Sequence, residues 1–203
     1  MYRVYLLLGS NMGDRKAVIE QATRELIDAL LPDYLEIGSL DEAVNTSQMY
    51  ETEPWGFESP DKFMNQAFCC VTELEPQQVL SECLRIEKEL GRVRNSEQYG
   101  ADGKRIYSSR VIDIDILLID KQEFVVSAIN DAEAGKDKRG EKIGNGMKGE
   151  KRKNGKPGES GEKCPQQRWV EVTVNTSDLI IPHPRLHERE FALKPLRELR
   201  RTI

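Results

Sequence analysis

The sequence predicts a domain in which strands and helices are mixed, with a polar insertion in its C-terminal half. Short apolar runs at residues 3–8, 63–74 and 110–118 have the composition of buried strands. Two longer segments, residues 14–31 and 76–91, instead repeat apolar residues at helical spacing. A chain of 203 residues is long enough for one such domain with an insertion.

The composition is that of a polar, acidic protein. Apolar residues make up 38% and charged residues 32% of the chain, the formal net charge is −5, and the pI is near 5.3. Proteins that bind nucleic acid usually carry a basic surplus, so this charge balance argues against that class. An acidic protein that binds a polyanion must do so through a local cluster of arginines.

The cysteines and the N-terminus predict a reduced, cytoplasmic protein. The cysteines lack C-x-x-C spacing and partner histidines, so a zinc site is not expected. Cys69 and Cys70 are adjacent in an expected strand, where they point to opposite faces and suit buried thiols. The apolar N-terminal run is too short for a signal sequence, and no run reaches transmembrane length.

The first part of the chain contains a strand, a helix and a second strand. Residues 3–8 form an apolar run that ends at Gly9, and a turn leads to Asp14, which can cap a helix. Apolar residues then recur at helical spacing as far as Pro32, which ends the helix. Residues 47–52 are expected to form a strand.

The middle of the chain repeats this alternation. Pro76 suits the first turn of a helix, and Gly91 ends the apolar stripe of that helix. The expected order is a strand at 63–74, a helix at 76–91, a polar loop at 92–109, the strand at 110–118, a turn at Asp120-Lys121 and a short strand at 123–126.

Residues 128–167 form a segment dominated by Lys, Gly and Glu, which cannot bury enough apolar surface to offset its ordering entropy. We interpret it as a flexible insertion in a single domain that spans residues 1–203. Its cations could contact a polyanion, but a solvated loop explains them more simply. Residues 169–174 alternate like a strand and could pair with residues 123–126 as a hairpin, and a helix is expected at 190–199.

Two aspartates interrupt the apolar strand at 110–118. Asp113 and Asp115 are two residues apart, so their carboxylates project from one face of a strand. Such a pair resists burial unless a cation lies between its members, and Mg²⁺ prefers oxygen ligands of this kind. The pattern also fits a solvated strand face with the neighbouring isoleucines pointing inward. Arg110, three residues ahead of Asp113, favours the metal site.

Aromatic residues and an asparagine form a second stretch of interest. Trp55 and Phe63 could stack on the faces of a flat heterocycle, while the Asn65 amide offers a donor and an acceptor to its edge. For either residue taken alone, the simpler interpretation is favoured: Phe63 as a core strand residue and Trp55 as a loop anchor.

Arginines gather in two further stretches. Arg92 and Arg94 follow the expected end of a helix, where they could bind phosphate oxygens or only favour the helix dipole. Residues 181–191 hold both histidines together with Arg185 and Arg189. Carboxylates for a metal, arginines for phosphates and aromatics for a flat ring suit phosphoryl transfer. The chain has no G-x-x-x-x-G-K-[ST] motif, so it is not a P-loop enzyme.

Six blocks of the chain, in this order, resemble the 6-hydroxymethyl-7,8-dihydropterin pyrophosphokinases of folate biosynthesis. They are G-S-N at 9–11, Y-E-T-E-P-W-G at 50–56, F-M-N-Q-A at 63–67, I-E-x-x-L-G-R-x-R at 86–94, S-R-V-I-D-I-D-I-L at 109–117 and I-P-H-P-R-L-H-E-R-x-F at 181–191. They cover nearly all of the chain outside the insertion, and the last two blocks are specific in combination.

The resemblance implies a ferredoxin-like α+β fold, in which helices flank an antiparallel sheet of a single pyrophosphokinase domain. It implies an ATP-dependent transferase that passes pyrophosphate to the pterin hydroxymethyl group and releases AMP. The partners would be these two small molecules, with no nucleic acid and no membrane, and the protein would act as a monomer in the cytoplasm.

Carried over by position, the family's site falls on residues of these blocks. Asp113 and Asp115 would bind two Mg²⁺ ions and, with Arg92 and Arg110, would form the catalytic centre. The residues implied in binding ATP are Glu87, Arg92, Arg94, Arg110, Ile116, His183 and Arg189. The residues implied in binding the pterin are Thr52, Glu53, Trp55, Phe63, Asn65 and Phe191.

The sequence also departs from the family pattern. The loop before Arg110 is longer, which leaves open whether Tyr99 takes the family's stacking role, and Pro184 stands where tyrosine is common. Two alternative interpretations are a ferredoxin-like module that binds RNA and a catalytically silent relative. The paired aspartates argue against an RNA-binding strand, and the intact arginines argue against a silent relative.

Overall fold

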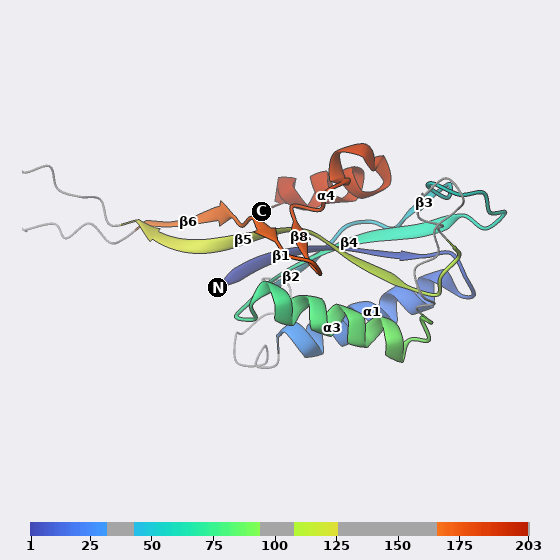
Figure 1. The fold of residues 1–203 in the computed structure, drawn as a ribbon, viewed down its shortest axis with the longest axis horizontal. Helices are drawn as coiled ribbons and strands as arrows, with labels where there is room; N and C mark the ends of the chain where they lie inside the picture. The colour runs from blue at the N-terminus through green and yellow to red at the C-terminus, as the bar shows by residue number, and fades with distance from the viewer. Residues whose placement is uncertain (32–42, 94–107, 126–165, 203) are drawn as a thin grey trace, which may run out of the picture. The chain divides into compact units, whose positions relative to one another are not determined.

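The computed structural model describes residues 1–31, 43–93, 108–125 and 166–202 (Figure 1). The chain divides into two compact units. The first, Met1–Glu123 with Trp169–Ile203, contains the helices and all the site residues discussed below. In the second unit, Phe124–Arg168, the structure describes residues 124–125, which end one strand, and residues 166–168, which begin the next strand.

Strands and helices follow one another largely as predicted. The described strands are β1 (Tyr2–Ser10), β2 (Val44–Thr46), β3 (Tyr50–Thr52), β4 (Phe63–Thr72), β5 (Asp113–Val125), β6 (Gln166–Glu171), β7 (Val174–Asn175) and β8 (Ile180–Ile181). The described helices are α1 (Arg15–Leu30), α3 (Pro76–Glu89), the 3₁₀ turn η2 (Leu186–Glu188) and α4 (Glu190–Thr202).

Strand β1 is central to an antiparallel sheet. It pairs with β4 on one side and β5 on the other, in the described order β2–β4–β1–β5–β6, and β3 also pairs with β4. Alternate side chains of β1 face opposite ways, so Leu6 and Leu8 pack with α1 and α3, whereas Tyr5 and Leu7 pack with α4. This arrangement confirms the predicted α+β class with an antiparallel sheet and helices, and it is consistent with a ferredoxin-like fold.

Local signals set the helix starts. The Asp14 carboxylate accepts a hydrogen bond from the Ala17 amide at 3.1 Å and caps α1, as its position predicted. At α3, the Gln78 side chain accepts a hydrogen bond from the Glu75 amide at 2.9 Å, and Pro76 stands in the first turn. These helices cover one face of the sheet, while α4 lies on the other face (Figure 1).

One predicted turn is absent, because β5 continues through Asp120 and Lys121 in register with the start of β1. The Lys121 ammonium lies 5.6 Å from the centre of the Tyr2 ring, and the Asp120 carboxylate lies 3.8 Å from the guanidinium of Arg200 on α4. These partners let two charged residues remain inside a strand. The prediction of a turn followed by a separate strand at 123–126 is therefore wrong.

Two other predicted strands are shorter than expected. Residues 47–52 contribute only β3, because Glu198 on α4 accepts the Gln48 amide hydrogen at 3.0 Å and draws this segment towards the helix. Residues 169–174 are divided between β6, which lies beside β5 as predicted, and β7, which pairs with β8.

The predicted insertion at 128–167 lies outside the described residues, apart from Gln166 and Gln167 in β6. Most of the loop at 92–109, with Arg94 and Tyr99, also lies outside them. Among the described cysteines, Cys69 and Cys70 belong to the two opposite apolar clusters, as predicted, and are free buried thiols.

No helix in the described parts of the chain combines the length and the apolar character that crossing a membrane requires.

The end of α1 provides a test of this packing. The buried Thr72 hydroxyl donates to the Leu30 carbonyl at 2.7 Å, a helix-end carbonyl without an intrahelical partner. We expect Thr72→Val to lower the free energy of unfolding by about 1–3 kcal/mol, because it buries that carbonyl unpaired. Urea denaturation measures this change.

Thr23→Val is the matched control. The Thr23 hydroxyl donates to the Ile19 carbonyl at 2.9 Å, but this carbonyl lies inside α1 and already accepts a helical hydrogen bond. Equal losses in the two variants would contradict the importance of the Thr72 bond.

Candidate active site

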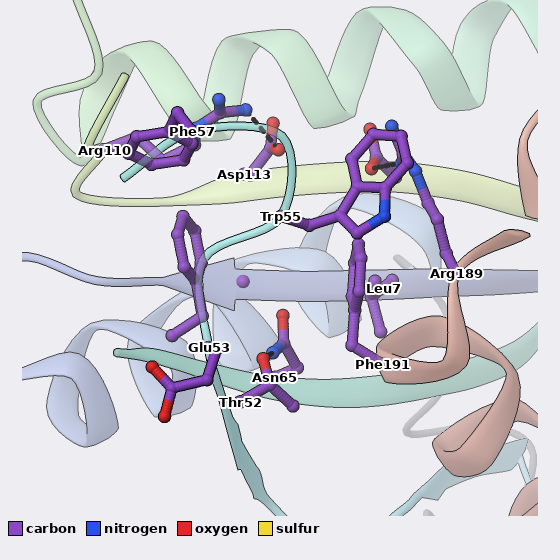
Figure 2. A pocket seen from close by; sticks show the side chains of 13 residues that line it. Leu7, Thr52, Glu53, Trp55, Phe57, Asn65, Arg110, Asp113, Arg189 and Phe191 are labelled. Carbon is purple, nitrogen blue, oxygen red and sulfur yellow. Dashed lines mark hydrogen bonds and ion pairs between the residues drawn. The ribbon is translucent and has the colours of Figure 1, made fainter. Parts of the chain in front are cut away.

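A cleft lies on the α4 face of the sheet, beyond the N-terminal end of that helix (Figure 2). It encloses about 500 Å³, its open mouth included. Its lining residues are Leu7, Gly9, Thr52, Glu53, Trp55, Phe57, Phe63, Asn65, Arg110, Asp113, Asp115, Arg189 and Phe191. The cleft thus joins residues from widely separated parts of the chain.

The floor of the cleft follows from strand register. Gly9 on β1 is paired with Asn65 on β4 and with Asp113 on β5, so these three positions form a row across the sheet. Two residues earlier, Leu7 is paired with Asp115 and forms the next row. Because residues two apart share a strand face, the two aspartates point into the same cleft, as predicted.

Gly9 leaves room at the centre of this floor. A Cβ atom at this position would lie 3.0 Å from the Asn65 Oδ1 atom, closer than ordinary van der Waals contact allows, and 3.8 Å from Phe63 Cδ1. The absence of a side chain therefore keeps the Asn65 amide in its place beside β1.

Asp113 lies between two arginines. Its Oδ1 atom is paired with the Arg92 guanidinium, and its Oδ2 atom accepts a hydrogen bond from Arg110 at 2.6 Å (Figure 2). Arg92 also donates to Glu87, which is 1% exposed and accepts the Ile114 amide hydrogen at 2.8 Å. Buried Glu87 thus ties α3, Arg92 and β5 together.

The two aspartates differ in their electrostatics. Burial raises the pKa of Asp113, but the charges of Arg110 and Arg92 outweigh it and hold the pKa below its ordinary value. Burial and the nearby charge of Asp113 raise the pKa of Asp115 to about 6, although Arg189 opposes this shift. Asp113 is thus a stable anion, whereas Asp115 lacks enough positive charge around it.

Arg189 reaches Asp115 from the segment before α4. Its Nη1 atom donates to Asp115 Oδ2 at 3.0 Å, and its guanidinium carbon lies 5.0 Å from the Trp55 ring centre and 5.7 Å from that of Phe191. The residue is 8% exposed, and its Nε atom has no hydrogen-bond partner in the described structure. Arg189 therefore belongs to both the charged and the aromatic part of the cleft.

His183 lies against the charged part of the cleft. Its main-chain amide donates to the Leu117 carbonyl at 2.9 Å, which ties it to β5. Burial, helped by the charge of Arg189, lowers the pKa of His183 to about 4, so the ring is neutral at physiological pH. The Arg185 amide donates to His183 Nδ1 at 3.2 Å, and the Arg189 Nη1 atom lies 3.4 Å from His183 Nε2.

The other end of the cleft is aromatic. The rings of Trp55 and Phe191 are 6.4 Å apart, and Phe57 meets Phe63 edge to face at 6.2 Å. The buried Asn65 side chain donates to the Thr52 hydroxyl at 2.8 Å, a bond that uses one of its hydrogens and leaves its oxygen facing Gly9.

The structure brings most of the predicted site residues together. The six residues predicted for the pterin line the cleft, as do Arg110, Asp113, Asp115 and Arg189. Arg92 contacts Asp113, His183 contacts Arg189, and Glu87 contacts Arg92. Ile116 differs, because its side chain is buried in the core on the α1 and α3 face. Arg94 lies outside the described residues.

Sequence reasoning missed four residues. Leu7, Gly9 and Phe57 line the cleft, and Asn11 binds the main chain of Arg110. Gly9 and Asn11 stood in a recognised motif, and Phe57 followed one. Leu7 could have been found from its position two residues before Gly9 on the same strand face.

The arrangement has a clear chemical capacity. One half of the cleft holds paired carboxylates and arginines, which can accommodate a metal-bound phosphate chain. The other half holds aromatic rings and a buried amide, which can accommodate a flat ring with polar edges.

Comparison with known proteins is consistent with this capacity. Residues 5–201 match the family model of 7,8-dihydro-6-hydroxymethylpterin-pyrophosphokinase. A 2-amino-4-hydroxy-6-hydroxymethyldihydropteridine pyrophosphokinase of Porphyromonas gingivalis is 43% identical over 115 residues, which cover 57% of this chain and 67% of the relative. The enzyme of the same name from Bacillus subtilis is 28% identical over 195 residues, covering 96% of this chain and 76% of the relative.

A longer protein also matches. The folic acid synthesis protein fol1 of Pneumocystis carinii is 29% identical over 196 residues, which cover 97% of this chain but 17% of that protein.

Proposed function

Because the chain belongs to the 7,8-dihydro-6-hydroxymethylpterin-pyrophosphokinase family, we propose that it transfers pyrophosphate from ATP to the hydroxymethyl group of 6-hydroxymethyl-7,8-dihydropterin. The chain is an enzyme of the transferase class. In the proposed reaction the hydroxymethyl oxygen forms a bond to the β-phosphorus of ATP. The bond from that phosphorus to the oxygen of AMP breaks, AMP leaves, and the hydroxyl proton passes to solvent. The product is an intermediate of folate biosynthesis.

One observation carries this proposal. A single row across three strands, Asn65–Gly9–Asp113, joins the amide suited to a flat ring to the carboxylate suited to a metal–phosphate complex. A pyrophosphokinase of this class must hold a pterin and a triphosphate side by side, and the bare Gly9 position leaves the space between them open.

The residues present fit magnesium. No group of three or more acidic, histidine or cysteine side chains is placed to hold an ion within the described parts of the chain, but two aspartates line one cleft. Mg²⁺ is commonly held by one or two carboxylates together with substrate phosphates and water. Burial and the charge of Asp113 raise the pKa of Asp115, and a cation beside the two carboxylates would offset both effects. We propose Asp113 and Asp115 as ligands of two ions.

When bound, magnesium supplies charge neutralisation for the phosphate oxygens and orientation of the attacking hydroxyl. The chain's own contribution is positioning. Arg92 and Arg110 stand on either side of Asp113, so their guanidinium groups are already in place beside the proposed phosphate site. We also assign His183 to the nucleotide: its neutral ring lies 3.4 Å from the Arg189 guanidinium, which adds a further cation beside Asp115.

Three further residues were predicted to bind ATP, and each would act in a different way. Glu87 is 1% exposed and already paired, so we propose that it supports Arg92 and the start of β5 rather than meeting the nucleotide with a free carboxylate. Since the Ile116 side chain lies in the core, its proposed contact with ATP would come from the main chain. Arg94 remains a proposed phosphate ligand.

We assign the pterin to the aromatic end of the cleft. The oxygen of Asn65 and its second amide hydrogen can bind the polar edge of the ring, with Thr52 holding the amide in place. Phe63 and Phe191 supply ring faces, Trp55 closes the cleft over Phe191, and Glu53 lies at its rim.

The direct experiment is to incubate the purified protein with Mg-ATP and the reduced hydroxymethylpterin and to follow AMP by chromatography. We expect AMP and the pyrophosphorylated pterin in equal amounts, with no AMP when the pterin is omitted. Well-folded protein that forms no AMP would refute the proposed reaction, and tight RNA binding by such protein would favour the alternative of a binding module.

Gly9→Ala tests the space between the two halves. A Cβ atom 3.0 Å from Asn65 Oδ1 must displace that amide, so we expect the KM for the pterin to rise about tenfold, the equivalent of one lost hydrogen bond. The KM for ATP should change less, because the contact is with Asn65. Steady-state kinetics with each substrate varied in turn measures both.

The control for Gly9→Ala is the same substitution in the Asn65→Ala variant, which no longer has an amide to displace. A further large rise of the pterin KM in that background would mean that Gly9 acts in another way.

We further propose that the enzyme acts as a monomer in the cytoplasm, on small molecules alone. The buried free thiols of Cys69, Cys70 and Cys83 suit a reducing compartment. Size-exclusion chromatography with light scattering would test the oligomeric state.

A further inference from the structure

Asn11 is a buried polar residue that none of the proposed substrate contacts uses. It follows β1 directly and is 2% exposed. Its Oδ1 atom accepts the Arg110 amide hydrogen at 2.8 Å, its Nδ2 atom donates to the Ser109 hydroxyl at 2.9 Å, and its main-chain amide donates to the Arg110 carbonyl at 3.2 Å. Three hydrogen bonds therefore join Asn11 to a dipeptide about a hundred residues later.

These bonds act on the main chain from which a site residue extends. The Arg110 side chain donates to Asp113 at 2.6 Å and lines the cleft (Figure 2). Because its aliphatic stem is flexible, the reach of the guanidinium depends on where the main chain places the Arg110 Cα atom. The last paired positions of β1 and β5 are Gly9 and Asp113, so Arg110 lies beyond the sheet ladder. Asn11 extends the connection between the two strands to Arg110.

The amide is well suited to this task. The Asn11 side chain carries both an acceptor, which binds the Arg110 amide, and a donor, which binds the Ser109 hydroxyl. Removing the side chain would take a hydrogen-bond partner from both groups. A purely structural role would require only that the segment after β1 be joined to the segment before β5. The contact with both main-chain groups of Arg110 points to a more specific role.

We propose that Asn11 is a positioning residue for Arg110. By fixing the main chain at residues 109–110, its amide fixes the origin of the guanidinium that meets Asp113 and, on the proposed function, the transferred phosphates. The inference rests on the proposed function for its effect on turnover. It concerns a residue that touches neither substrate, so its effect must pass through Arg110.

A double-mutant cycle tests this dependence. Asn11→Ala is expected to lower kcat/KM about tenfold to a hundredfold in the wild-type background, because a guanidinium out of place loses much of its effect. In the Arg110→Ala background the same substitution should lower it less than threefold further. Asn45→Ala, on the edge strand β2 outside the cleft, is the matched control and should leave kcat/KM unchanged.

Additive losses in the cycle would overturn the proposal, because they would show that Asn11 acts independently of Arg110. Thermal unfolding of each variant separates the two roles: a structural role lowers the melting temperature equally in both backgrounds and leaves the kinetic losses additive. If Asn11→Ala does not fold, Ser109→Ala and Asn11→Asp enter the same cycle, with the same criterion of non-additivity.

Failure of the positioning role can be told apart from failure of the proposed reaction. If the wild-type protein releases no AMP, the reaction assigned above is wrong, and the cycle is repeated with the Kd of Mg-ATP measured by calorimetry. Coupling between Asn11 and Arg110 in that Kd would still support the positioning role, and additive changes in the Kd would overturn it.

Discussion

Replacing Asp113 or Asp115 by alanine is expected to abolish pyrophosphate transfer, with kcat reduced on the order of 10³-fold or more. Both carboxylates line the cleft from one face of β5, and they are the proposed ligands of the magnesium ions. The rate of AMP release at saturating Mg-ATP measures the effect. Substantial activity in both variants would show that the metal assignment is wrong.

Asp120→Asn is the matched control. Asp120 belongs to the same strand and is buried, but it meets Arg200 on α4 and does not line the cleft. We expect this variant to retain activity within about threefold of wild type, since it removes no proposed metal ligand. A loss equal to that of the other two would mean that β5 tolerates no change of charge.

The two site aspartates should differ in their effect on stability. Because the folded state lowers the pKa of Asp113, its charged form stabilises the fold above its unfolded pKa of about 3.9. Because the folded state raises the pKa of Asp115, its charge opposes folding at pH 7.5. At that pH we expect Asp113→Asn to lower the melting temperature and Asp115→Asn to leave it unchanged or raise it.

Arg189→Ala is expected to lower kcat/KM by about 10²-fold or more, the second largest effect. The residue pairs with Asp115 at 3.0 Å and lies over the rings of Trp55 and Phe191, so its loss disturbs both halves of the cleft. Arg189→Lys should recover only part of the activity, because an ammonium cannot pair and stack in the same way. Steady-state kinetics with each substrate varied shows which half suffers more.

Arg185→Ala serves as the control for Arg189. Arg185 comes from the same segment and lies 5.7 Å from the Trp55 ring centre, but it is exposed to solvent. We expect a loss of less than about fivefold, as for other exposed cationic contacts. If Arg189→Ala were as active as Arg185→Ala, the central role given to Arg189 would be refuted.

Much of the fold was predictable from local signals. Asp14 at the start of α1, Pro76 at the start of α3 and the alternating run before Leu118 all act over a few residues. The predictions failed where a distant residue decided the outcome. Asp120 and Lys121 look like a turn, but Arg200 and Tyr2 hold them in β5.

The residues of the candidate site were also largely predictable, but their relations to one another were not. Motifs identified Asp113, Asp115 and Asn65 by type and spacing. That Glu87 is buried and paired with Arg92, and that Asn11 holds Arg110, depends on contacts between elements that local patterns do not record.

The sequence by itself determined that Asp113 and Asp115 share one face of a strand, because side chains alternate along every strand. Only the tertiary structure decided what that face meets. The register of β1 with its two neighbours places Gly9 between Asn65 and Asp113, and α4 brings Phe191 to the same cleft. Strand register and helix docking depend on the packing of the whole core, so no single stretch of the chain contains that information.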